Sequence, residues 1–205
     1  MIAIVDYGMG NLRSLQNAFE YLGADVIITS DIEELEASER LVLPGVGAFG
    51  DAMKAIRERG LQGTLTRQAM ELKKPVLGIC LGMQLFARSS CEHGRHTGLG
   101  WLNADIRRLE VQRPLKVPHV GWNDLHFPPG DWLFKGLRPG HANFYFVHSY
   151  HMVCQDPGNL VATADYGGPV TAVVRAGNLV AAQFHPEKSQ DNGLKMLENW
   201  VDWKP

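Results

Sequence analysis

Cysteine is scarce in this sequence. The 205 residues contain three cysteines, Cys80, Cys91 and Cys154, and no Cys-x-x-Cys pair occurs. A sparse, odd number of cysteines argues against a scaffold held together by disulfides and is typical of proteins from a reducing compartment. We therefore expect a cytoplasmic protein.

An excess of one charge and long apolar runs are also absent. The chain has 20 Lys and Arg against 22 Asp and Glu, and no basic run exceeds two residues. This balance gives no indication of a surface for nucleic acid or membrane. No apolar run is long enough to span a membrane, and residues 1–6 lack the features of a signal peptide. The 45% content of hydrophobic residues suits a globular protein, and we expect one domain over residues 1–205.

The order of apolar and amphipathic segments predicts an α/β fold. In the first half, short apolar strands alternate with amphipathic helices, the first of which follows Asn11 as its N-cap and stops at Gly23. In the second half, short apolar runs are separated by Gly, Asn and Asp. We expect a three-layer fold with a mostly parallel central sheet, helices on both faces and added antiparallel strands. The expected strands are residues 2–5, 26–28, 41–43, 76–79, 144–148, 160–164, 171–175 and 179–184, and the further helices are 48–59, 61–72, 81–88 and 193–203.

Cys80 is the candidate nucleophile. It follows an apolar strand in the sequence Gly78-Ile79-Cys80-Leu81-Gly82, and a helical pattern begins after it. This is the pattern of a nucleophile elbow with sulfur in place of oxygen, in which a Cβ at either glycine would clash with the tight turn. A position at a helix N-terminus also favours the thiolate form. A buried structural cysteine is the alternative, and the paired glycines favour the nucleophile.

His185 and Glu187 are the candidate base and its orienting carboxylate. They follow another apolar run, and Pro186 between them favours extended backbone at His185. Residues two apart in an extended segment point the same way, so the Glu187 carboxylate can reach the imidazole. Because Cys80 and His185 both follow strands, we expect them at the carboxyl edge of the sheet.

A second turn after a strand is a candidate oxyanion hole. The tetrahedral intermediate of amide hydrolysis needs preorganised donors, and the Leu81 N–H, directly after the nucleophile, is one of them. The second donor is expected from Val46 or Gly47 in the glycine-rich turn at residues 44–50. An ordinary strand-to-helix turn explains the same residues equally well.

Other motifs in the sequence are weaker indications of a binding or catalytic site. Residues 7–12 resemble a phosphate-binding turn, but Arg13 stands where G-x-G-x-x-G needs glycine, so a dinucleotide site is not expected. The pairs His93/His96 and His148/His151 have a spacing that can serve a metal, but no further ligand lies near either pair. We expect no metal and no cofactor. His148 is a rival base, although it lacks an acidic residue two positions on.

Several motifs together resemble one known family. Residues 77–84, Leu-Gly-Ile-Cys-Leu-Gly-Met-Gln, and 183–187, Gln-Phe-His-Pro-Glu, are similar to the class I (triad-type) glutamine amidotransferases. Residues 6–12, 43–47, 118–123 and 144–150 narrow the resemblance to the glutaminase subunits of imidazole glycerol phosphate synthases, enzymes of histidine biosynthesis.

This resemblance implies a function and a partner. Cys80, His185 and Glu187 would hydrolyse L-glutamine to glutamate, and ammonia would pass to a (βα)₈-barrel cyclase subunit in a heterodimer with lyase-type activity. That subunit would make imidazole glycerol phosphate and aminoimidazole carboxamide ribonucleotide. In the family, the oxyanion hole is completed when the partner holds its ligand. The residues implied for glutamine binding are Gly47, Gln84, Glu92, Ser149 and Tyr150, and those for the partner interface are Asn11, Trp122, Tyr145 and Lys188.

Three alternatives stay open at this point. The nearest is a paralogous amidotransferase subunit that feeds ammonia to an enzyme aminating a surface sugar. A catalytically idle regulatory subunit is disfavoured by the intact Cys80, His185 and Glu187. A cysteine peptidase or hydrolase of similar architecture is disfavoured by the motifs outside those three residues.

Overall fold

A nine-stranded mixed sheet forms the centre of the computed structural model, which describes residues 1–205. Its strand order is β2-β1-β3-β4-β13-β12-β11-β8-β9. The pairings from β2 to β13 are parallel, and those from β13 to β9 are antiparallel. The strands are β1 (Ile2–Val5), β2 (Val26–Thr29), β3 (Arg40–Leu43), β4 (Val76–Ile79), β8 (His119–His126), β9 (Asn143–His148), β11 (Leu160–Asp165), β12 (Pro169–Ala176) and β13 (Leu179–Ala182).

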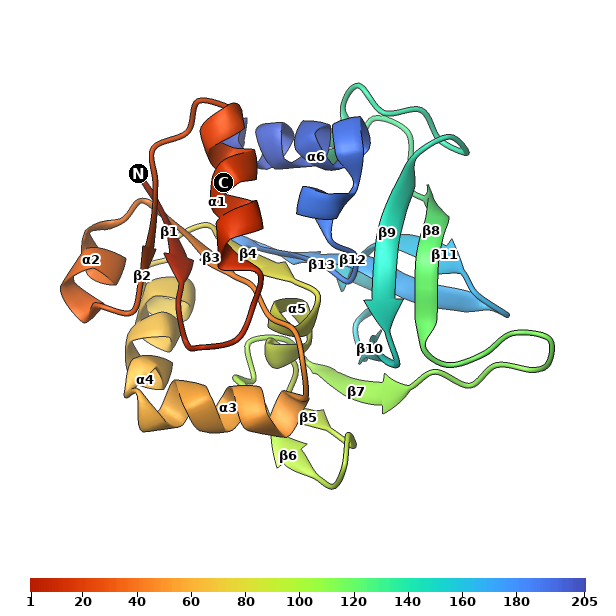
Figure 1. The fold of residues 1–205 in the computed structure, drawn as a ribbon, viewed down its shortest axis with the longest axis horizontal. Coiled ribbons are helices and arrows are strands. Elements are labelled where there is room, and N and C mark those ends of the chain that lie inside the picture. The colour runs from red at the N-terminus through yellow and green to blue at the C-terminus, as the bar shows by residue number, and fades with distance from the viewer.

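Helices cover both faces of the sheet. Figure 1 shows α1 and α6 above the sheet and α3, α4 and α5 below it. The helices are α1 (Leu12–Tyr21), α2 (Ile32–Ala37), α3 (Phe49–Glu58), α4 (Leu61–Thr66), α5 (Leu81–Leu85) and α6 (Gln190–Asp202), with a π-helical turn at Arg67–Glu71 and three-residue 3₁₀ turns at Trp132–Phe134, Pro157–Asn159 and Pro186–Lys188. The expected three-layer α/β fold is therefore confirmed. None of these helices is both long enough and apolar enough to cross a membrane.

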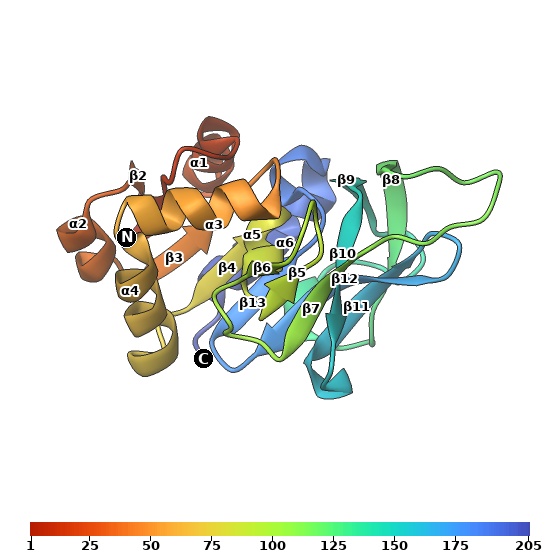
Figure 2. The same ribbon diagram turned by 90° about the horizontal axis from the view of Figure 1, so that it is seen from below.

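A small second sheet lies beside the lower helices, as Figure 2 shows from below. Its order is β10-β7-β5-β6, built from β5 (Ser89–Ser90), β6 (His96–Thr97), β7 (Ala104–Arg108) and β10 (Tyr150–Cys154). Strand β10 follows β9 after a single residue, Ser149, so the two sheets meet next to the end of β9.

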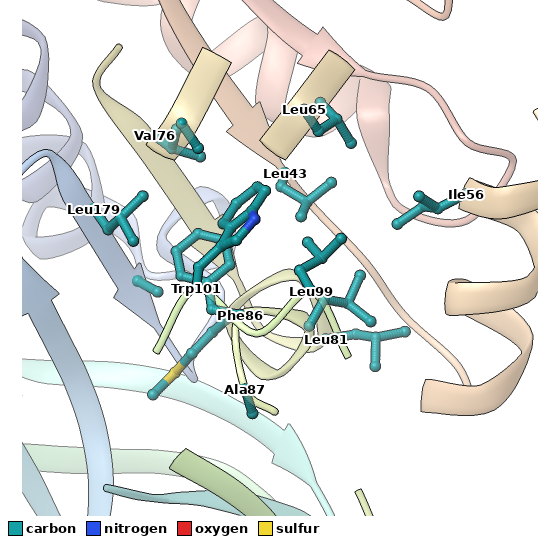
Figure 3. Packing of buried hydrophobic residues seen from close by; sticks show 14 of the residues in the cluster. Leu43, Ile56, Leu65, Val76, Leu81, Phe86, Ala87, Leu99, Trp101 and Leu179 are labelled. Carbon is teal, nitrogen blue, oxygen red and sulfur yellow. The ribbon is translucent and has the colours of Figure 1, made fainter. Parts of the chain in front are cut away.

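The hydrophobic core has two parts, one on each face of the central sheet. One cluster of 28 buried residues lies on the α3 and α4 side. Part of it is drawn in Figure 3, where the rings of Phe86 and Trp101 lie together with centroids 4.9 Å apart. The other cluster of 26 residues joins α1 and α6 to the sheet through Phe19 and Trp200. Strands β1, β4 and β13 are buried along their whole length, as expected for parallel strands covered on both faces.

Several local expectations were wrong. The expected helix 61–72 is α4 followed by the π-helical turn, and the helix after Cys80 ends at Leu85 rather than at residue 88. Helix α2 and strands β5, β6, β7, β8 and β10 were not expected. Asn11 does precede α1, but its side chain makes no capping hydrogen bond.

Candidate active site

Cys80 occupies the sharp turn between β4 and α5. Its φ of 53° and ψ of −108° lie outside the regions that non-glycine residues favour, so the turn is strained. The flanking glycines explain how the turn is built. A Cβ on Gly82 would lie 1.8 Å from the Leu43 carbonyl oxygen, and one on Gly78 would lie 2.9 Å from the Phe86 ring. The predicted elbow is therefore present at its predicted residues.

His185 and Glu187 form a buried pair. The His185 Nδ1 lies 2.8 Å from the Glu187 Oε1, and their side chains are only 2% and 1% exposed. Because a carboxylate can only accept, Nδ1 carries a proton and Nε2 is left for Cys80. Burial lowers the pKa of His185, but hydrogen bonding and charge interactions with Cys80 and Glu187 outweigh it and raise that pKa to about 10. The imidazole therefore holds a second proton readily.

The Cys80 sulfur has two further neighbours. The amide Nε2 of Gln183 lies 3.7 Å from Sγ, and the carbonyl oxygen of Val147 lies 4.0 Å from it. The carbonyl can only accept from a thiol, whereas the amide N–H can donate to a thiol or a thiolate. Sequence reasoning missed Gln183, although it stands two residues before His185 at the end of an apolar run, where alternation places both on one side.

A cavity of about 450 Å³ opens over Cys80 and His185. The five residues implied for glutamine binding all line it: Gly47, Gln84, Glu92, Ser149 and Tyr150. Two of their polar groups are already engaged. Glu92 Oε2 accepts the Phe49 N–H at 2.7 Å, which ties the 91–96 loop to α3. The amide nitrogen of Gln84 donates both to the Tyr150 carbonyl and to Gln183 Oε1 at 3.0 Å, so only its carbonyl oxygen is left to bind a ligand.

The predicted oxyanion hole is not assembled in this conformation. The Leu81 N–H donates to the Gly45 carbonyl at 3.3 Å and is not free for a substrate oxygen. The buried Tyr7 hydroxyl donates to the neighbouring Pro44 carbonyl at 2.6 Å and anchors the same turn. Val46 and Gly47 do line the cavity next to Leu81. The residues expected for the oxyanion hole therefore lie beside the candidate nucleophile, but the Leu81 N–H is occupied by the Gly45 carbonyl.

Three of the four residues implied for a partner interface form one surface patch. Trp122 and Tyr145 are paired across β8 and β9, with ring centroids 6.0 Å apart, and Trp122 is 49% exposed. The Lys188 ammonium lies 6.0 Å from the Tyr145 ring centroid, and Lys188 also lines the cavity. This patch therefore borders the cavity mouth. Asn11 lies directly before α1, and no hydrogen bond or ion pair joins it to the other three.

His148 is not a rival base in this structure. Its Nδ1 lies 2.9 Å from the Tyr150 carbonyl oxygen and its Nε2 lies 3.1 Å from His119 Nδ1, so both ring nitrogens are engaged. Burial is the main reason that the pKa of His148 falls to about 3, and burial likewise lowers the pKa of His119 to about 4. His148 therefore stays neutral, with no carboxylate to orient it. No group of three or more His, Cys, Asp or Glu side chains is arranged to hold a metal ion.

Comparison with known proteins gives a family and a fold. A model described as glutamine amidotransferase class-I matches residues 3–203. The chain is 46% identical over 209 residues to "Imidazole glycerol phosphate synthase subunit HisH 2" of Nitrobacter winogradskyi, covering 100% of this chain and 99% of the relative. It is 48% identical over 203 residues to the HisH subunit of Rhodopirellula baltica, covering 98% of this chain and 97% of that one.

Solved structures agree on the architecture. PurLQS from Thermotoga maritima matches with a TM-score of 0.73 at 21% identity, over 98% of this chain and 97% of that chain. A crystal structure described as a glutamine amidotransferase matches with a TM-score of 0.71 at 24% identity, over 98% and 100% of the two chains. These likenesses show the shared fold.

Proposed function

The chain belongs to the class I glutamine amidotransferases, and we propose that it is the glutaminase subunit of an imidazole glycerol phosphate synthase in histidine biosynthesis. The observation that carries the proposal is the buried His185–Glu187 pair, whose imidazole lines a cavity of about 450 Å³ together with Cys80. A nucleophile, a base and an orienting acid in this arrangement can cleave an amide. We infer that residues 1–205 act as one domain.

The proposed reaction has two halves. The Cys80 sulfur attacks the side-chain amide carbon of L-glutamine, and a C–S bond forms while the C–N bond breaks. His185, whose pKa is raised to about 10, carries the proton that the departing nitrogen needs to leave as ammonia. Water then attacks the thioester, gives a proton to His185 and releases glutamate together with the free thiol. Glu187 holds the imidazole in the tautomer that this exchange requires.

The oxyanion formed in each half needs donors that this conformation withholds. Rotation of the Gly45–Val46 peptide would release the Leu81 N–H, and would turn the Val46 N–H toward the cavity. We propose that binding of the partner with its nucleotide ligand favours the rotated form, which is a population shift between two loop states. No cofactor enters this scheme.

The proposed partner is the (βα)₈-barrel cyclase subunit, in a heterodimer, with the patch of Trp122, Tyr145 and Lys188 at the interface and Asn11 near it. Trp122 is exposed and packs against the Tyr145 ring, and exposed aromatic side chains of this kind are typical anchors of protein interfaces. Because the patch borders the cavity mouth, ammonia released at Cys80 would leave directly into the covered interface. The relatives named as HisH subunits support the same assignment.

Complementation of a histidine auxotroph tests the proposal. A strain that lacks both synthase subunits receives the cyclase subunit from the source organism, together with this chain or its Cys80→Ala variant, on medium poor in ammonium. We expect growth without histidine with the parent chain only. Growth with neither chain, while ammonium alone supports the cyclase, contradicts the assignment and favours a paralogue that feeds another synthase. Growth with both contradicts the role of Cys80.

A further inference from the structure

Gln183 is a fully buried amide that touches the candidate nucleophile and has no part in the triad. It follows β13, and its own side chain is 0% exposed. Its backbone N–H donates to the Ala172 carbonyl at 2.8 Å, while the Cys80 N–H donates to the Ala182 carbonyl, also at 2.8 Å. The backbones of Gln183 and Cys80 are therefore held in register by adjacent strands, and the amide has little freedom to move away from the sulfur.

The orientation of the Gln183 amide is determined by its neighbours. The Tyr150 carbonyl can only accept, so the Gln84 group 3.0 Å from it must be the NH₂. That same nitrogen lies 3.0 Å from Gln183, which must therefore present its oxygen to Gln84. The nitrogen of Gln183 is then turned toward Cys80 Sγ, 3.7 Å away. The chain Tyr150, Gln84, Gln183, Cys80 thus directs one N–H at the sulfur.

This N–H acts differently on the two forms of the sulfur. A hydrogen bond to an anion is stronger than one to a neutral group, so the amide favours the thiolate. The Val147 carbonyl, 4.0 Å from the sulfur, is attractive only to the thiol. Without the Gln183 donor, the Val147 carbonyl would be the remaining hydrogen-bond partner of the sulfur outside the triad. The equilibrium between thiolate and thiol would then shift toward the thiol.

We propose that Gln183 is a positioning residue for Cys80, which stabilises the thiolate and holds it in line for attack, with Gln84 fixing the Gln183 amide. This inference rests on the proposed glutaminase function for its catalytic consequence, but its direct effect is on the sulfur alone. Gln84 then has two tasks, since the same side chain lines the cavity and anchors Gln183.

The test measures how fast iodoacetamide alkylates Cys80 as a function of pH. Cys91 and Cys154 are first replaced by serine, so that only Cys80 reacts. The variants are Gln183→Met, which has a similar length and no donor, and Gln183→Asn, which keeps an amide that is too short to reach the sulfur. The matched control is Gln68→Met, another glutamine that is 1% exposed but lies on the π-helical turn away from the cavity.

We expect both Gln183 variants to shift the alkylation profile to higher pH by about 0.5 to 1 unit, and the Gln68→Met profile to stay unchanged. With the partner subunit present, kcat for glutamine should fall about threefold to tenfold with KM within about twofold. Co-purification of each variant with the cyclase subunit reports whether the variant is folded and docked.

Unshifted alkylation profiles in both Gln183 variants overturn the proposal, whatever happens to turnover. A shift in Gln68→Met equal to that in Gln183→Met also overturns it, because the effect would then be general loosening of the fold. If the profiles of both Gln183 variants shift but the parent chain never hydrolyses glutamine, the role of Gln183 is upheld and the proposed function is refuted instead.

Discussion

The Leu81 N–H donates to the Gly45 carbonyl oxygen at 3.3 Å, one residue after Cys80. This hydrogen bond places a carbonyl where an oxyanion would need a donor. The turn at residues 44–47 is held at one end by the hydrogen bond from Tyr7 to Pro44. The rest of the site is organised, since the buried His185–Glu187 pair is formed and the cavity over Cys80 is open. We infer that this conformation is the resting state of the proposed enzyme, and that rotation of the Gly45–Val46 peptide would make the site active.

Gly82, the second glycine of the elbow, has a steric role that the addition of one methyl group tests. We expect Gly82→Ala to lower the free energy of unfolding by about 3 kcal/mol or to prevent folding, because its Cβ would lie 1.8 Å from the Leu43 carbonyl oxygen. Gly63→Ala is the matched control. It lies in α4 with open space around it, and should raise stability by about 0.5 to 1 kcal/mol. Urea denaturation measures both, and equal effects would contradict the elbow geometry.

Removal of the nucleophile should separate the two activities of the complex. We expect Cys80→Ala to lower glutamine-dependent synthesis by at least about 10³-fold and to leave ammonia-dependent synthesis within about twofold. The physical reason is that ammonia supplied from solution needs no thioester. Synthesis rates with glutamine or with ammonium salt measure the two arms. A parallel loss of both activities would contradict the assignment of Cys80 to the glutamine-dependent step alone.

The two partners of the buried pair should differ in importance. We expect His185→Ala to lower kcat about 10³- to 10⁴-fold, and Glu187→Gln to lower it about 10- to 100-fold, since the imidazole moves protons and the carboxylate only orients it. Steady-state glutamate release at saturating glutamine, with the liganded cyclase subunit present, gives both kcat values. A larger loss in Glu187→Gln than in His185→Ala would reverse the assigned roles.

The neutral pair of His119 and His148 should make the fold sensitive to acid. Their pKa values are lowered from 6.5 to about 4 and about 3, mainly by burial. Below pH 6.5 the two imidazoles are therefore protonated in the unfolded chain before they are protonated in the folded chain. Their contribution to stability is complete above pH 6.5 and is lost as pH falls toward 3. We expect the melting temperature of His148→Gln to fall less steeply than that of the parent between pH 6.5 and 4. His126→Gln, at an exposed position on β8, should follow the parent curve, and a parallel curve for His148→Gln would contradict the argument.

Most of the strands and helices before Cys80 could be predicted from the sequence because their signals are local, α2 being the exception. Strands β1 and β4 are short apolar runs, and Gly78 and Gly82 indicate the elbow without reference to the rest of the chain. The second half could not be predicted as well. Strands β7 and β8 are half-exposed and mix polar with apolar residues, so their pairing with β10 and β9 depends on distant partners.

The site shows the same division. Cys80, His185 and Glu187 stand in short motifs whose spacing predicts their roles. The role proposed for Gln183 depends on a contact 103 residues away along the chain and on the amide orientation set by Gln84. Likewise, no local pattern shows that the Gly45 carbonyl occupies the Leu81 N–H, because the direction of one peptide in a glycine-rich turn is set by packing against Tyr7 and Leu81.

The most direct test of the account is the rate of glutamate release from L-glutamine, measured for this chain alone, with the cyclase subunit, and with the cyclase subunit plus its nucleotide ligand. We expect slow release from the isolated chain and strong stimulation only when the liganded partner is present, because the Leu81 donor must first be freed. Full turnover by the isolated chain would contradict the proposal that the hydrogen bond between Leu81 and Gly45 keeps the isolated chain in a resting state. No release under any condition, with ammonia-dependent synthesis intact, would contradict the glutaminase itself.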